Sequence, residues 1–283
     1  MGSKWEQIVL ALRAFTNFLF VPGNRTERFA KALASAADLV CIDLEDSVPL
    51  AEKDDARGAA LAAIAAHDQG RLALRINGLR TAAGLADILA LAVSSRPEFL
   101  FVPMVESATE LDILRNILGD GITFIPLIES VKGIRAAAGI ASSPGVSAIM
   151  FGGGDFAGEL GVKLAWEPLL HARCEIIMSC AAANIGAIDA PYIDLENDAG
   201  LADECGKAKA LGFQAKAAIH PRQIDAIHSA FRPSAAEISE ARAAIAAFDA
   251  AGGAAIRFQG KMLEAPIIRQ YQQILSLGET SNA

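Results

Sequence analysis

Residues 123–155 read TFIPLIESVKGIRAAAGIASSPGVSAIMFGGGD, and this stretch decides the fold. It contains two short runs, 123–128 and 148–151, that are apolar at nearly every position. An alanine-rich segment with helical periodicity, around 130–141, lies between them. Strands that are apolar on both faces are typical of a parallel sheet covered by helices. The stretch therefore predicts one strand–helix–strand unit.

The same alternation extends over most of the chain. Seven of the eight predicted helices lie around 25–37, 52–67, 81–93, 107–118, 165–183, 200–211 and 221–230, and the eighth is the one at 130–141. The eight predicted strands are Phe18–Val21, Leu39–Leu44, Leu72–Ile76, Phe99–Pro103, Thr123–Ile128, Ala148–Phe151, Ala187–Ala190 and Ala215–Ile219. Eight repeats over roughly 215 residues favour a (β/α)8 TIM barrel over an open doubly wound sheet.

The two ends of the chain differ from this repeat. We expect the barrel domain to span residues 1–232, with a short amphipathic helix within residues 4–13. Residues 233–283 form a second segment, in which Ser234 is suited to cap a helix beginning near Ala235. A strand at 255–259 and a last helix near 266–277 follow. We predict that this segment acts as a lid or an oligomer contact.

Composition excludes several classes of protein. The chain has 283 residues, 53% of them hydrophobic, which is ample for a core. Its 25 Lys and Arg against 33 Asp and Glu give a net charge of −8, which argues against nucleic acid as a partner. The four cysteines lack zinc-site spacing. No apolar run approaches the roughly 18 residues that cross a membrane, so we expect a cytoplasmic protein with no membrane partner.

Carboxylates follow several predicted strands, where barrel enzymes have their active sites. Glu45 and Asp46 follow the second strand, Glu129 the fifth and Asp155 the sixth. Buried like charges repel, and a divalent cation would relieve that repulsion. An all-oxygen ligand set favours Mg²⁺, with Mn²⁺ as a substitute, held first of all by Glu129 and Asp155. The alternative is that each acid caps a helix or lies on the surface.

Other strand ends carry candidate substrate contacts. Arg75 lies at the end of the third strand, and its guanidinium matches a substrate carboxylate, although an ion pair with Glu45 or Asp46 is the alternative. Glu45 and Asp46 are suited to anchor metal-bound water, orient Arg75 or act in acid–base chemistry. Glycines 152–154 allow a ligand to approach the backbone. His220 is either a buried structural histidine or a catalytic one.

Together these residues resemble the citrate lyase β-subunit-like proteins of the HpcH/HpaI aldolase superfamily, which include malyl-CoA and citramalyl-CoA lyases. The resemblance covers about residues 18–275. Its motifs are Leu19-Phe20-Val21-Pro22-Gly23, Asp43-Leu44-Glu45-Asp46-Ser47-Val48, Arg75-Ile76-Asn77, Leu127-Ile128-Glu129-Ser130, Gly152 to Phe156, Ala187-Ile188-Asp189, Ile219-His220-Pro221-Arg222-Gln223-Ile224 and Gly260-Lys261-Met262.

The resemblance implies a homotrimer or hexamer with Mg²⁺ held by Glu129 and Asp155. Arg75 would contact the substrate carboxylate and carbonyl, and Gly153 and Gly154 would line the substrate site. Glu45 and Asp46 would support the metal's water shell and Arg75. An acid matching Glu264, in the C-terminal segment of a neighbouring subunit, would take part in the chemistry.

The implied reaction is cleavage of a short 3-hydroxy dicarboxylic acyl-CoA of the citryl-, malyl- or citramalyl-CoA type. The products would be acetyl-CoA and a 2-oxo acid. Alternatives are a CoA-independent aldolase or lyase on a free oxo acid, and a non-catalytic homologue that binds metal and oxo acid.

The chain departs from the family pattern at three places near the predicted site. Thr16 stands where many members have an anion-binding Arg, Met104 where many have Lys, and Gly154 where many have Glu beside the metal ligand.

Overall fold

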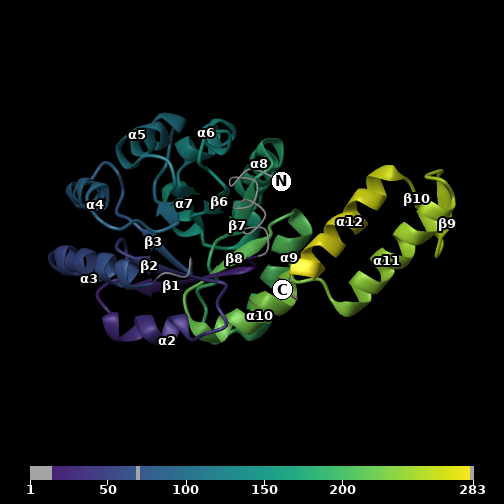
Figure 1. Ribbon diagram of the computed structural model, residues 1–283, viewed down its shortest axis with the longest axis horizontal. Coiled ribbons are helices and arrows are strands. Elements are labelled where there is room, and N and C mark those ends of the chain that lie inside the picture. Colours follow the sequence, from purple (N-terminus) through teal and green to yellow (C-terminus); the bar gives the residue numbers. More distant parts are fainter. Residues whose placement is uncertain (1–14, 68–70, 281–283) are drawn as a thin grey trace. The chain divides into compact units, whose positions relative to one another are not determined.

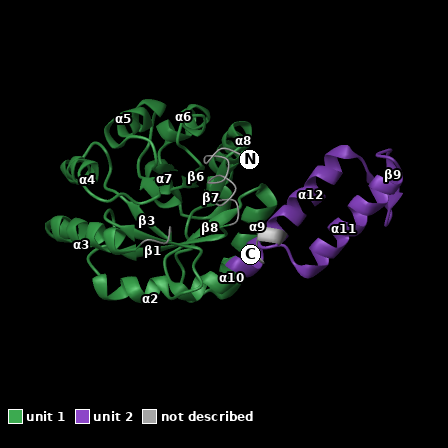
Figure 2. Cartoon of the chain, viewed as in Figure 1, with its two compact units in different colours: residues 1–227 green, residues 228–283 purple. Residues whose placement is uncertain are grey.

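A computed structural model describes residues 15–67 and 71–280 of the chain. The amphipathic helix expected within residues 4–13 lies outside the described residues. The chain consists of two compact units, residues 1–227 and residues 228–283, and the boundary between them lies inside one helix (Figure 2). Among the described residues, none of the helices is both long and apolar enough to span a membrane.

The first unit is a closed barrel of eight parallel strands in sequential order, with helices around the strands (Figure 1). This confirms the predicted TIM barrel. The strands are β1 (Asn17–Pro22), β2 (Leu39–Asp43), β3 (Leu72–Arg75), β4 (Phe99–Val102), β5 (Thr123–Ile128), β6 (Ala148–Phe151), β7 (Gly186–Asp189) and β8 (Ala215–Ala218).

Helices connect the strands. The α-helices of this part of the chain are α2 (Phe29–Leu33), α3 (Lys53–Ala66), α4 (Ala82–Ala92), α5 (Ala108–Leu118), α6 (Val131–Ala141), α7 (Gly153–Leu160), α8 (Trp166–Ala183), α9 (Asp198–Leu211) and α10 (Ile224–Phe231). Three short 3₁₀ helices are η1 (Thr26–Arg28), η2 (Leu50–Glu52) and η3 (Pro221–Gln223). The sequence analysis does not anticipate α7, because its first residues, Gly153 and Gly154, have a low helix propensity.

Alternate strand residues fill the barrel interior, because successive side chains of a strand point to opposite faces. Phe18, Cys41, Phe101, Leu127 and Met150 belong to one buried cluster to which all eight strands contribute. The residues between them face the helices, so both faces of the sheet are buried. This packing explains the continuous apolar runs in the sequence.

The second unit has a hydrophobic core of its own. It contains α11 (Ala235–Ala250), β9 (Ile256–Phe258), β10 (Lys261–Leu263) and α12 (Ala265–Thr280). Phe248, Leu263 and Tyr271 belong to its buried cluster. Ser234 accepts a hydrogen bond from the N–H of Glu237, so it caps α11 as predicted.

Candidate active site

A cavity of about 450 Å³ opens where the barrel strands end, lined by residues of five strands and by the loops after them. Acidic and glycine residues line one part of it, and apolar side chains line the rest. The lining residues are Phe20, Pro22, Asp43, Asp46, Ser47, Arg75, Leu127, Glu129, Met150, Gly152, Gly153, Gly154, Asp155, Pro191 and Ile219. Most of the predicted site residues of the first unit are therefore brought to one cavity.

Arg75 lies in a two-pronged ion pair with Asp43, its register partner on the neighbouring strand. Arg75 Nε donates to Asp43 Oδ1 at 2.6 Å, and Nη2 donates to Oδ2 at 2.8 Å. Burial acts to raise the pKa of Asp43, but the charge and hydrogen bonds of Arg75 outweigh it, and the pKa is lowered. Glu45 and Asp46 are the partners of Arg75 expected from the sequence, and Asp43 is not among them, because its pairing depends on the strand register.

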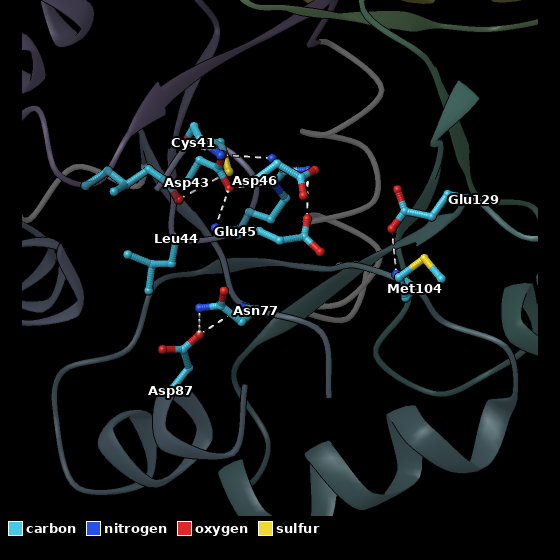
Figure 3. A network of polar contacts seen from close by, with 12 residues as sticks. Cys41, Asp43, Leu44, Glu45, Asp46, Asn77, Asp87, Met104 and Glu129 are labelled. Carbon is cyan, nitrogen blue, oxygen red and sulfur yellow. Dashed lines mark hydrogen bonds and ion pairs between the residues drawn. The ribbon is translucent and has the colours of Figure 1, made fainter. Parts of the chain in front are cut away.

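The remaining edge of the Arg75 guanidinium faces the other two acids of this loop, Glu45 and Asp46, which are labelled in Figure 3. Nη1 lies 2.9 Å from Glu45 Oε2 and 3.6 Å from Asp46 Oδ2. Burial, with repulsion from Glu129, Asp46 and Asp43, raises the pKa of Glu45 to about 9 despite the nearby Arg75 charge. Burial also raises the pKa of Asp46. One guanidinium, already engaged by Asp43, is not enough to neutralise these carboxyls.

Two contacts fix the loops that carry these groups. Lys53 Nζ donates to the carbonyl oxygens of Leu44 and Glu45, at 2.7 and 2.8 Å. Asp87 Oδ2 accepts from the backbone N–H and from Nδ2 of Asn77, at 2.8 and 2.7 Å (Figure 3). Each contact holds the chain just after a strand, so the strand ends keep their side chains at the cavity.

Glu129 follows β5 and is buried, with 4% of its surface exposed. Its Oε1 accepts from the backbone N–H of Met104 at 2.6 Å (Figure 3). Burial raises the pKa of Glu129 to about 7, and repulsion from Asp155 adds to the effect. Because this N–H belongs to the backbone, Glu129 keeps its support although Met104 replaces the usual Lys.

Asp155 lies in the first turn of α7 and is exposed to the cavity. A helix N-terminus favours a carboxylate there. Gly153 is buried, and a Cβ on it would lie 3.2 Å from that of Ala190. Gly154 is exposed, and a Cβ on it would meet no atom within 4 Å. Both glycines line the cavity, and Gly154 leaves open space beside Asp155.

The donor set fits the Mg²⁺ that the resemblance implies. Burial and mutual repulsion raise the pKa values of Glu45, Asp46 and Glu129 although Arg75 is near, and a bound cation would favour the ionised carboxylates. Among the described residues, no three His, Cys, Asp or Glu side chains converge closely enough to hold a metal. A cation between Glu129 and Asp155 would thus depend on water and substrate for its other ligands, as Mg²⁺ commonly does.

Three residues singled out from the sequence lie elsewhere. Glu264 belongs to the second unit, where it is exposed at the start of α12. His220 is exposed, its Nδ1 accepts from the N–H of Arg222, and it is not among the residues that line the cavity. Thr16 donates from Oγ1 to Asp38 at 2.9 Å, where β1 and β2 begin. The expectation that Thr16 deprives the site of an anion-binding group is wrong, because residue 16 lies at the opposite end of the strands.

A second charged cluster lies behind the barrel wall, and the sequence analysis misses most of it. Asp189 accepts from Arg173 Nε at 2.8 Å and from Lys216 Nζ at 2.6 Å. Lys216 also donates to Glu204 at 2.7 Å. Asp189 and Lys216 alternate with Ile188 and Ala217 of the interior cluster, so they face the helices.

The comparisons with known proteins identify the family and agree with this fold. The family model described as HpcH/HpaI aldolase/citrate lyase matches residues 17–221. Citrate lyase subunit beta of Escherichia coli (strain K12) is 34% identical over 288 residues, covering 95% of each chain. An L-malyl-CoA/beta-methylmalyl-CoA lyase of Cereibacter sphaeroides is 32% identical over 301 residues, covering 94% of this chain and 95% of the lyase.

One solved structure is similar over almost the whole chain. Protein CitE from Mycobacterium tuberculosis, in complex with magnesium, acetoacetate and coenzyme A, matches with a TM-score of 0.83. Its sequence is 33% identical, and the match covers 94% of this chain and 99% of that one.

Proposed function

The chain belongs to the HpcH/HpaI aldolase/citrate lyase family and is a carbon–carbon lyase, and we propose that it depends on Mg²⁺ and acts on an acyl-CoA. The substrate class is a short 3-hydroxy dicarboxylic acyl-CoA of the citryl-, malyl- or citramalyl-CoA type. The products are acetyl-CoA and a 2-oxo acid.

One observation carries the proposal. Glu129 and Asp155, at the ends of adjacent strands, line the same cavity as Arg75, and the carboxyls there exceed the positive charge. A cation balances that excess, and a chelating substrate completes its ligands. The magnesium and coenzyme A bound by the similar CitE protein support the same assignment.

The chain's own residues bind and orient the substrate. Glu129 and Asp155 hold the cation, which when bound supplies Lewis-acid polarisation of the substrate oxygens. Arg75 offers its Nη1 edge to the substrate carboxylate and carbonyl, since Asp43 holds the other edge in a fixed orientation. Backbone groups of Gly153 and Gly154 line the substrate beside Asp155.

The reaction breaks the bond between the α-carbon and the hydroxyl-bearing carbon of the thioester. The hydroxyl gives its proton to a carboxylate, and its carbon becomes the keto carbon of the oxo acid. The electron pair of the broken bond stays on the acetyl-CoA fragment as an enolate, which then takes up a proton. Glu45, protonated at neutral pH, is suited to supply that proton, and Asp46 and Glu264 are the other carboxyls assigned to acid–base work.

We extend the proposal to the second unit. The segment from residue 233 acts as a lid, and Glu264 reaches a neighbouring subunit's site in a trimer or hexamer. Glu264 is exposed in the unit described here, as a group that meets another subunit must be before assembly. Glu264→Gln should lower kcat and leave the Mg²⁺ dependence and the mass of the assembly unchanged. Unchanged kcat would exclude Glu264 from the chemistry.

The partner expected for this chain is another copy of itself. Helix α4 carries an exposed apolar stripe that is suited to such a contact. Leu85 and Leu89 of this helix, and Val93, which caps its C-terminus, follow one another at intervals of four residues and are 57%, 68% and 86% exposed. Sedimentation of wild type and Leu89→Glu tests the assembly. A monomeric wild type would contradict it.

The decisive experiment is detection of acetyl-CoA by mass spectrometry. The protein is incubated with Mg²⁺ and malyl-, citramalyl- or citryl-CoA, with EDTA and Asp155→Asn as controls. Acetyl-CoA formed from one thioester, and lost in both controls, is the expected result and identifies the oxo acid. No acetyl-CoA from a protein that binds Mg²⁺ would favour a CoA-independent lyase or a non-catalytic homologue instead.

A further inference from the structure

The carboxylate of Glu129 is contacted from both sides by backbone of the neighbouring strand ends. On the β4 side, Val105 N–H donates to the carbonyl of Leu127 at 3.2 Å, which places Met104 beside Glu129. On the β6 side, Gly152 N–H donates to the carbonyl of Ile128 at 3.0 Å. The two flanking residues, Met104 and Gly152, are therefore held in register with Glu129 by main-chain hydrogen bonds.

Met104 has a strained backbone. Its φ of +53° lies in the left-handed region, which residues with a side chain rarely adopt. This conformation directs its N–H at Glu129 Oε1, 2.6 Å away (Figure 3), while the methionine side chain is 37% exposed. Strain of this kind persists only where the surrounding structure enforces it, and it gathers at functional sites.

Gly152 is required for space and not for its backbone angles. Its φ of −92° is open to any residue. A Cβ at this position would collide with Cβ and Oε2 of Glu129 and would lie 3.0 Å from Cδ of the same side chain. The Cα of Gly152 thus packs directly against the carboxylate, on the side opposite to the Met104 N–H.

We propose that these two groups, the N–H of Met104 and the Cα of Gly152, form a clamp that holds the Glu129 carboxylate in one orientation for a divalent cation. In this Glu129 clamp, Oε1 is engaged by Met104 and Oε2 lies against Gly152, so rotation of the carboxylate is blocked. Met104 and Gly152 are positioning residues. The inference rests on the proposed function only in taking the ligand of Glu129 to be a cation.

Substitutions can distinguish the effect of the clamp on cation affinity from any effect of the Met104 side chain. Met104→Ala keeps the N–H and the left-handed backbone, so it should leave cation affinity unchanged. Met104→Val places a β-branched residue where φ is positive, so it should displace the N–H and weaken binding about tenfold. Gly152→Ala should weaken binding at least as much. Gly158→Ala is the matched control, because it lies on α7 and its Cβ would meet no atom within 4 Å.

The first measurement is Mn²⁺ binding, followed by electron paramagnetic resonance of the free ion. Weaker binding in Met104→Val and Gly152→Ala, with Met104→Ala and Gly158→Ala like wild type, is the expected result. Equal affinity in all five proteins would overturn the clamp and leave the proposed lyase function intact.

A second measurement tests the clamp without any cation. In EDTA, Gly152→Ala should lower the melting temperature, and the loss should shrink in a Glu129→Gly background, where Cβ, Oε2 and Cδ of residue 129 are all removed. An equal loss in both backgrounds would overturn the contact. If the wild type binds no Mn²⁺, the metal-dependent function fails, and this thermal cycle alone still decides whether Gly152 packs against Glu129.

Discussion

Two clusters of buried charge occupy this barrel, one at the cavity and one between the strands and the helices. Behind the wall, Asp189 and Glu204 meet Arg173 and Lys216, so two acids face two bases. Burial acts to raise the pKa of Asp189, but Lys216 and Arg173 outweigh it and the pKa is lowered. Every charge in this cluster has a partner of opposite sign.

The cavity has the opposite balance. Asp43, Glu45, Asp46, Glu129 and Asp155 gather near Arg75, and Lys53 is bound to backbone carbonyls. The pKa values of Glu45, Asp46 and Glu129 are raised, because burial and mutual repulsion prevail there. Burial alone does not distinguish a structural charge from a functional one. An excess of buried charge of one sign indicates a functional site, because the fold would be more stable if those charges were removed.

The largest expected effect breaks the balanced cluster. Lys216→Met leaves Glu204 and one oxygen of Asp189 without their cation, and removal of one partner from a buried pair costs about 3–5 kcal/mol. Urea denaturation should therefore give a much lower midpoint for the variant. The double variant Lys216→Met/Asp189→Leu is the comparison, and it should recover part of the loss. An unchanged midpoint in Lys216→Met would mean that the network contributes nothing to stability.

The next effect concerns the two-pronged ion pair between Arg75 and Asp43 at the cavity. Arg75→Lys cannot reproduce both bonds to Asp43, and losing a hydrogen bond to a charged group costs about 2 kcal/mol. The free energy of unfolding should fall by that amount, and oxo-acid binding measured by calorimetry should weaken. Wild-type stability together with wild-type affinity for glyoxylate, pyruvate and oxaloacetate would remove Arg75 from both roles.

Glu45→Gln should raise the free energy of unfolding, where the two preceding substitutions lower it. The folded-state pKa of Glu45, about 9, is above its ordinary value, so its contribution is full at low pH and is lost as pH rises toward 9. In EDTA the variant should gain stability over wild type between pH 5 and pH 8, by more than about 1 kcal/mol at the upper end.

Glu106→Gln serves as the control for that titration. Burial acts to raise the pKa of Glu106, but Lys132 and Arg80 lower it, so its replacement should bring no gain at high pH. A stability difference for Glu45→Gln that stays constant from pH 5 to pH 8 would show that Glu45 is already ionised at pH 5.

The smallest effect on the free energy of unfolding is expected for charges at the surface, where solvent screens both paired and unpaired groups. Arg80 pairs with Glu106 and Glu110 at 2.7 and 2.8 Å, but its side chain is 55% exposed. Exposed pairs contribute about 0–1 kcal/mol, so Arg80→Ala should shift the unfolding free energy by about 0.5 kcal/mol or less. A loss as large as that of Lys216→Met would undermine the distinction drawn between buried and exposed charge.

The local sequence pattern was sufficient to predict the strands of the barrel, but it did not predict features that depend on contacts between distant residues. The predicted strands Thr123–Ile128 and Ala148–Phe151 match β5 and β6, because a buried parallel strand has a clear apolar signature. Helix α7 escaped prediction since its glycines argue against a helix. Glycine stands at its N-cap and first residue because a Cβ on Gly152 or Gly153 would crowd neighbouring residues, which is a tertiary cause.

The site followed the same rule. Strand ends predicted which acids would gather, because a parallel barrel brings all carboxyl ends of its strands to one face. The ion-pair partners of these residues depend on the register between neighbouring strands and on the face of the sheet to which each side chain points. The pairing of Arg75 with Asp43 and the burial of Lys216 behind the wall needed three-dimensional information. The Met104 contact involves only the backbone, so no residue type signals it.

That last contact bears on how this site can change over evolutionary time. A hydrogen bond from a main-chain N–H survives exchange of the side chain, provided the new residue tolerates a positive φ. Position 104 can therefore pass through many unbranched residues while Glu129 stays in place. The barrel therefore has, beside Glu129, one position whose side chain can change without displacing the carboxylate that we propose as a cation ligand.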